Sequence, residues 1–119
     1  GFKNGTGGSV QIAIDAIQSA SRSHHFLSVT KQGVSAIVST TGNKSCHLIL
    51  RGGSTGPNYE KPFIDEAVTM LREQNMNESI MIDCSHGNSL KEFRNQPMVA
   101  RSIANQVAEG SREITSLMI

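Results

Sequence analysis

The chain has 119 residues, of which 37% are hydrophobic and 18% are charged, a composition typical of one folded domain or less and not of a disordered segment. The formal net charge of +1, without a basic patch studded with aromatic residues, argues against a nucleic-acid partner. No run of about 18 apolar residues and no signal peptide is present, so we expect a soluble, cytoplasmic protein with no membrane partner.

The first predicted β/α unit covers residues 1–22. A strand end at Phe2 and Lys3 is followed by a glycine-rich turn and then by an amphipathic helix over residues 9–22. Ser9 is the expected N-cap, and the apolar face is formed by residues at helical spacing, which are Val10, Ile14 and Ile17, widened by Ile12 and Ala13. Lys3 lies at the strand-to-helix junction, where phosphates often bind. The glycine-rich run alone is more often just a turn than a phosphate-binding loop.

The next segment is predicted to be an antiparallel hairpin. The β-rich runs 26–30 and 35–40 are separated by a short loop that contains Gly33, as in many hairpins. Because a hairpin interrupts the alternation of strand and helix, the segment is either decoration of the scaffold or a ligand-binding, regulatory insertion. Composition does not distinguish the two.

A buried strand is predicted at Leu48–Leu50, because this short apolar run is bounded by glycines and is too brief for a helix. It ends in Arg51, and Gly52 and Gly53 allow a ligand to approach the backbone closely. A charge at the end of a buried strand needs a partner. That partner is either a nearby carboxylate or a bound anion, and this stretch alone leaves both open.

The remaining elements continue the pattern. A helix over residues 61–75 precedes a second buried strand, residues 79–84, which ends near His86. Ser89 and Glu92 match a capping box for the next helix, which Pro97 interrupts or restarts and Gly110 ends. A further strand is predicted over residues 113–119.

This order, β-α-hairpin-β-α-β-α-β, predicts an α/β fold with parallel strands and right-handed crossovers. Three predicted strands end in a polar residue with glycine close behind, at Lys3, Arg51 and His86, and the ends of parallel strands meet on one face of a barrel or along one crevice of an open sheet. Two cations and a histidine on one face predict a phosphorylated ligand beside a metal or a general acid/base. His24, His25 and His47 lack this placement, so we expect them to lie at the surface or at strand starts.

Four short sequence motifs occur in a specific order and spacing: Gly-Phe-Lys-Asn-Gly-Thr (1–6), His-Leu-Ile-Leu-Arg-Gly-Gly (47–53), Pro-Asn-Tyr (57–59) and Ile-Asp-Cys-Ser-His-Gly-Asn-Ser (82–89). Together they resemble the microbial, feedback-regulated type of DAHP synthase (3-deoxy-D-arabino-heptulosonate 7-phosphate synthase). The resemblance runs through essentially the whole chain. It implies the later strands and helices of a (β/α)8 TIM barrel, with residues 1–119 as the C-terminal part of one barrel domain and residues 26–40 as an inserted regulatory hairpin.

The resemblance also implies an activity and its residues. The family condenses phosphoenolpyruvate with erythrose 4-phosphate and requires a divalent metal, for which Mn, Fe, Co and Zn remain open. Lys3 and Arg51 match the residues that bind phosphoenolpyruvate, and His86 matches a metal ligand. Phe26, Ser28 and Val38 match positions that line an allosteric pocket for an aromatic amino acid. Ser28 favours phenylalanine over tyrosine as the effector, and a homo-oligomer is expected.

A complete (β/α)8 barrel needs about 250 residues, and the chain begins at Gly1 and ends in an apolar run at Ile119. We therefore expect an excerpt of a longer sequence. The family's other metal ligands would lie outside it, and Cys84 is not expected to replace them. One imidazole is too few ligands to hold a metal firmly, so these 119 residues alone are predicted to be inactive.

Two alternatives remain at this stage. The related synthase that joins phosphoenolpyruvate to arabinose 5-phosphate shares the barrel but fits the hairpin less well. The other is a non-catalytic module that binds phosphate or an aromatic amino acid.

Overall fold

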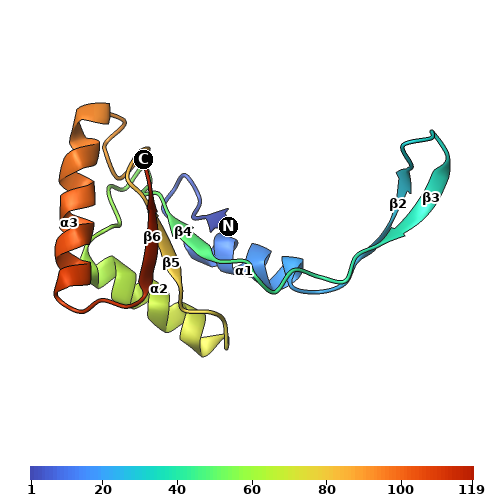
Figure 1. Ribbon diagram of the computed structural model, residues 1–119, viewed down its shortest axis with the longest axis horizontal. Coiled ribbons are helices and arrows are strands. Elements are labelled where there is room, and N and C mark those ends of the chain that lie inside the picture. Colours follow the sequence, from blue (N-terminus) through green and yellow to red (C-terminus); the bar gives the residue numbers. More distant parts are fainter.

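The computed structural model describes residues 1–119 and has two parts, a parallel sheet covered by helices and a hairpin that projects from it (Figure 1). The sheet has the strand order β1-β4-β5-β6, with β1 at Phe2–Lys3, β4 at Leu48–Leu50, β5 at Ile80–Asp83 and β6 at Ile114–Met118. All three neighbouring pairs are parallel. The connecting helices are α1 (Gln11–Ala20), α2 (Lys61–Glu73) and α3 (Gln96–Ala108), and one 3-10 turn, η1 (Phe93–Asn95), precedes α3. The predicted α/β class is confirmed.

The hydrophobic core lies between this sheet and its helices. Every residue of β4 is buried, as its unbroken apolar run predicts for a strand covered on both faces. The buried face of α1 consists of Ala13, Ile14 and Ile17. The predicted widening of this face is confirmed for Ala13 and wrong for Ile12, which is 54% exposed. Successive helical residues turn by about 100°, which places Ile12 on the side opposite Ile14.

Both predicted N-terminal helix caps are wrong, whereas α3 does end just before Gly110, as predicted. Helix α1 has Val10 at its N-cap position without a side-chain cap, and the Ser9 carbonyl instead accepts the Gly5 N–H at 2.9 Å. Ser89 and Glu92 form no capping box, because the backbone after Ser89 turns into the left-handed region at Leu90 and Lys91. Helix α3 begins only at Gln96, with a proline in its first turn, a position that suits proline's fixed φ.

The hairpin consists of β2 (His25–Val29) and β3 (Ser35–Ser39), which pair antiparallel as a two-stranded sheet of their own. Both predicted strands are confirmed, each with ends shifted by a residue at most. Figure 1 shows the hairpin held away from the parallel sheet by two extended segments, which accounts for the elongated shape of 51 × 31 × 23 Å. No helix is long and apolar enough to cross a membrane.

Candidate active site

Lys3 and His86, two of the three predicted strand-end residues, meet at Asp83. Lys3 Nζ lies 2.7 Å from Asp83 Oδ2, and His86 Nδ1 lies 2.8 Å from the same oxygen. The side chain of Asp83 is 1% exposed, whereas those of Lys3 and His86 are 34% and 48% exposed. A buried carboxylate therefore holds a cation and an imidazole at the carboxyl end of the sheet.

Asp83 is ionised in this setting. Burial by itself raises the pKa of this carboxyl group, but the hydrogen bond from Lys3, the backbone N–H of Ser85 and the nearby positive charges outweigh it. The net effect is a pKa below the usual value for aspartate. The Ser85 N–H donates to Oδ1 at 2.8 Å, so both carboxylate oxygens are hydrogen-bonded within the chain.

His86 is placed by an unusual backbone conformation. Its φ of 50° lies in the left-handed region, which costs a non-glycine residue about 1–3 kcal/mol, and strained residues of this kind cluster at active sites and ligand clamps. The turn that maintains it includes the Lys91 N–H, which donates to the His86 carbonyl at 2.8 Å. This turn directs the imidazole back to the carboxylate three residues earlier.

Arg51, the third predicted residue, follows β4, which lies between β1 and β5 in the sheet. Its backbone N–H donates to Asn4 Oδ1 at 2.8 Å. Its side-chain Nε is buried and has no hydrogen-bond partner in this chain. A buried guanidinium N–H without a partner is costly, which favours the bound-anion alternative over a carboxylate within the chain.

Three buried asparagines tie the strand ends together. Asn4 Nδ2 donates to the Gly52 carbonyl at 3.0 Å, and Asn4 Oδ1 accepts from Asn58 Nδ2 at 3.2 Å. Asn88 Oδ1 accepts from the Asn58 N–H at 2.8 Å, while Asn88 Nδ2 donates to the carbonyls of β4 and β5. This asparagine network (Asn4, Asn58 and Asn88) fixes the loops that carry the site. Sequence reasoning missed it and Asp83, although an acid at the end of an apolar strand was a usable signal.

Glycines let these loops approach one another closely. A Cβ on Gly52, whose φ is 69°, would lie 2.6 Å from the backbone nitrogen of Asn88. A Cβ on Gly53 would lie 2.6 Å from the backbone nitrogen of Gly8. Real Cβ atoms do not come so near to backbone, so the turn after β4 requires glycine at both positions.

The chain supplies one candidate metal ligand. His86 has its Nδ1 on a carboxylate, the outer-shell arrangement of most metal-binding histidines, which leaves Nε2 for an ion. No group of three or more His, Cys, Asp or Glu residues in the chain could hold a metal by itself. Cys84 is fully buried in the hydrophobic core, and burial raises the pKa of its thiol. It packs within the core.

The three predicted allosteric residues share one face of the hairpin. Phe26 lies directly opposite Val38, and Ser28 is two residues further along the same strand, so all three side chains point to the same side. Of the other histidines, His24 and His25 are exposed at the base of the hairpin, and His47 precedes β4. These positions agree with the surface and strand-start placement expected for them.

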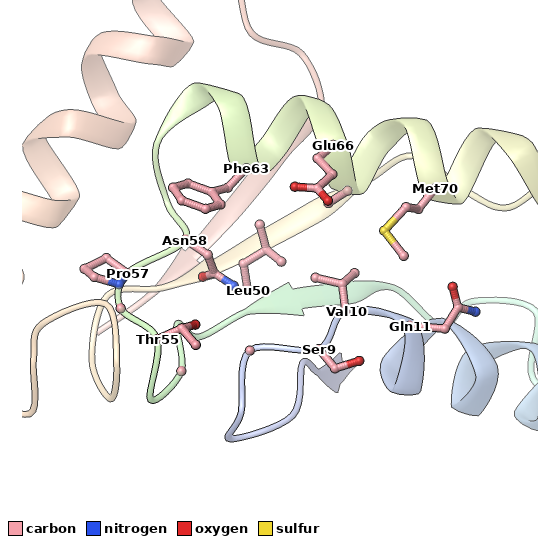
Figure 2. Close-up of a pocket in the computed structure, with 14 residues that line it drawn as sticks. Ser9, Val10, Gln11, Leu50, Thr55, Pro57, Asn58, Phe63, Glu66 and Met70 are labelled. Carbon is pink, nitrogen blue, oxygen red and sulfur yellow. The ribbon is translucent and has the colours of Figure 1, made fainter.

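A separate cleft of about 410 Å³ lies between α1 and α2 (Figure 2). Figure 2 shows Val10 and Gln11 from the start of α1 facing Phe63, Glu66 and Met70 from α2. None of the predicted site residues lines this cleft. It is distinct from the group at Asp83.

Comparison with known proteins agrees with the resemblance. The model of the DAHP synthetase I family matches residues 1–119. The chain is 58% identical over its whole length to a putative phospho-2-dehydro-3-deoxyheptonate aldolase of Schizosaccharomyces pombe, of which it covers 32%. It is 50% identical over 123 aligned residues to the phenylalanine-inhibited enzyme of Saccharomyces cerevisiae, of which it covers 33%.

Among solved structures, a phospho-2-dehydro-3-deoxyheptonate aldolase from Francisella tularensis matches with a TM-score of 0.92 and 47% sequence identity. The match covers 98% of this chain and 34% of that protein. The chain thus spans about a third of the length of the relatives it matches. It belongs to the DAHP synthetase I family.

Proposed function

We propose that this chain is the C-terminal part of a single (β/α)8 barrel that acts as a DAHP synthase. The reaction is the condensation of phosphoenolpyruvate with erythrose 4-phosphate to DAHP and phosphate, the first step of the shikimate pathway, in the cytoplasm. The observation that carries the proposal is the group at the strand ends, where Lys3 and His86 share Asp83 and Arg51 Nε has no partner. Family membership supports it independently.

Lys3 and Arg51 are suited to bind phosphoenolpyruvate, which carries a phosphate and a carboxylate. The guanidinium of Arg51 offers parallel donors that match the oxygens of either group, and the ammonium of Lys3 adds a compact positive charge. Asp83 holds that ammonium in place at 2.7 Å. Each charge-assisted hydrogen bond contributes about 1.5–3 kcal/mol to binding.

The divalent metal implied by the family (Mn, Fe, Co or Zn) would act, when bound, as a Lewis acid on the sugar aldehyde. In this chain His86 would supply one ligand through Nε2, and the remaining ligands would come from outside the 119 residues. Because one imidazole does not hold such an ion firmly, the chain by itself should show no turnover.

The chemistry assigned to this chain's own residues is binding and orientation. The enol carbon of phosphoenolpyruvate attacks the aldehyde carbon of erythrose 4-phosphate and forms the new carbon–carbon bond. Water then adds at the enolpyruvate carbon that bears the phosphate ester, and phosphate leaves with its bridging oxygen. Lys3 and Arg51 hold the anionic groups in position through both steps, which converts an encounter of two substrates into a reaction within one complex.

The test is a steady-state assay of the parent, meaning the longer barrel that we propose carries this chain. We expect consumption of phosphoenolpyruvate with erythrose 4-phosphate. Lys3→Met and Arg51→Met should each raise KM for phosphoenolpyruvate by about 10–100-fold. Lys61→Met is the matched control, because Lys61 is exposed and pairs only with Asp65. Equal turnover with arabinose 5-phosphate, or binding without turnover, would refute this assignment.

The hairpin is proposed to bind the aromatic effector at Phe26, Ser28 and Val38, in a parent that is a homo-oligomer. Their shared face supports a single pocket, and the resemblance at Ser28 favours phenylalanine as its ligand. Relatives named as phenylalanine-inhibited and as tyrosine-inhibited both match the chain. We expect phenylalanine to inhibit the parent. Val38→Asp should weaken this inhibition, whereas Ile37→Asp, on the opposite face of the hairpin, should not. Inhibition by tyrosine alone would contradict it.

A further inference from the structure

Both carboxylate oxygens of Asp83 are already engaged within the chain, so neither is available to a substrate. Oδ2 accepts from Lys3 Nζ and lies 2.8 Å from His86 Nδ1, and Oδ1 accepts from the Ser85 N–H. The carboxylate is fully buried beneath the two side chains that it holds, which are both partly exposed. Whatever binds at the strand ends therefore meets Lys3 and His86, and Asp83 acts only through them.

The carboxylate itself is rigidly held. Asp83 closes β5, and its backbone carbonyl accepts Asn88 Nδ2 at 2.8 Å. It lies in register with Met118 of the neighbouring strand β6. A group fixed by a strand and by the asparagine network can impose its position on flexible partners, whereas a long lysine side chain cannot fix itself.

The contact with His86 also decides which ring nitrogen carries the proton. Both Asp83 oxygens already accept hydrogen bonds, from the Lys3 ammonium and from the Ser85 N–H. In a neutral His86, Nδ1 must therefore be the donor in its contact with Oδ2. The lone pair of Nε2 is then free and directed away from Asp83. Without the carboxylate, either nitrogen could carry the proton.

We propose that Asp83 is a positioning residue that sets two binding groups at once: it fixes the Nδ1-protonated tautomer of His86 and holds the ammonium of Lys3 beside it. Its effect on the reaction rests on the proposed function, since Lys3 is there assigned to phosphoenolpyruvate and His86 to the metal. One carboxylate then positions both the group assigned to phosphoenolpyruvate and the group assigned to the metal.

The first test needs no variant of Asp83. Nitrogen-15 NMR of the metal-free parent reports the tautomer of each imidazole. The spectrum is recorded at about pH 8.5, roughly two units above the ordinary histidine pKa of about 6.5. His86→Gln identifies the signal of His86. We expect His86 to be protonated at Nδ1. Protonation at Nε2 would overturn the proposal, whether or not the parent is a DAHP synthase.

The second test compares Asp83→Asn with Asp65→Asn, a matched control at the exposed pair with Lys61. Binding of Mn²⁺ alone and of phosphoenolpyruvate alone is measured by calorimetry. Asp83→Asn should weaken the binding of both ligands by about 10–100-fold, the usual cost of losing an outer-shell partner. Lys3→Met should weaken only the binding of phosphoenolpyruvate, and His86→Gln should weaken only the binding of Mn²⁺. The control should match wild type.

The outcomes separate the two claims. Wild-type affinities in a folded Asp83→Asn variant, or loss of only one ligand, would overturn the positioning role. If this variant does not fold, the tautomer of His86 in the unmodified protein decides. A parent that binds both ligands but makes no DAHP would refute the proposed function and leave the role of Asp83 intact.

Discussion

Replacing Gly52 with alanine should strongly destabilise the fold, because this position combines two separate demands for glycine. Its φ of 69° lies in the left-handed region, and a Cβ there would lie 2.6 Å from both the Asn88 nitrogen and the Gly87 carbonyl carbon. Both of these atoms belong to the backbone. They cannot move aside as the end of a flexible side chain would, so the turn after β4 and the turn after β5 must separate.

The expected cost is the sum of the two effects. A non-glycine residue in the left-handed region costs about 1–3 kcal/mol, and overpacking of a close contact typically costs about 1–3 kcal/mol more. Gly52→Ala should therefore lower the free energy of unfolding by about 2–6 kcal/mol. Gly110→Ala isolates the first effect, because Gly110 has a φ of 109° and nothing within 4 Å of its Cβ position. Gly53→Ala isolates the second.

The assay is urea unfolding of the parent, followed by far-UV circular dichroism, for the wild type and the three alanine variants. Gly52→Ala should lose more stability than either single-effect variant, and about as much as the two together. If Gly52→Ala costs no more than Gly110→Ala, the two turns are not in the close contact described here.

Three further results are expected. Asn88→Ala leaves a buried N–H and two buried carbonyls without this hydrogen-bond partner. The free energy of unfolding, measured with urea, should fall by about 3 kcal/mol or more. A fall below about 1 kcal/mol would contradict the asparagine network. Iodoacetamide should modify half-buried Cys46 well before Cys84, because Cys84 is fully buried and burial raises the pKa of its thiol. Peptide mass spectrometry gives the order of labelling. Early labelling of Cys84 in the native protein would contradict this prediction. The hydrogen bond from Arg72 lowers the pKa of Glu78, so this exposed pair stabilises the fold above about pH 4.5 and stops doing so as pH falls through the lowered pKa. The small difference in urea midpoint between wild type and Arg72→Gln at about pH 7 should shrink steadily as the pH is lowered below about 4.5. A difference that stays constant over that range would count against this origin.

The sequence predicts the fold where the signal is local. The run Leu48–Leu50 is a buried strand with the predicted limits, because a short apolar segment between glycines has few alternatives. The capping box at Ser89 fails although its pattern is correct. The backbone turns into the left-handed region at Leu90 and Lys91, next to a segment that packs against Gly52, which lies far away in the chain.

The candidate site is predictable only in part for the same reason. Lys3, Arg51 and His86 are found because each lies at or just after the end of a strand, and parallel strands end on one side. The pairing of Lys3 with Asp83 joins residues 80 positions apart, which no local pattern contains. The role of Asp83 therefore emerges only when the sheet is assembled.

The asparagine network has a consequence for the order of folding. It links Asn4 to Asn58, which lie 54 positions apart, and Asn58 to Asn88, which lie 30 positions apart. Contacts so distant along the chain must first close long loops, so they form late compared with the helices. During synthesis the backbone N–H of Asn58 can find its partner only after residue 88 has left the ribosome, so the loops of the site are fixed only once most of the chain has been made.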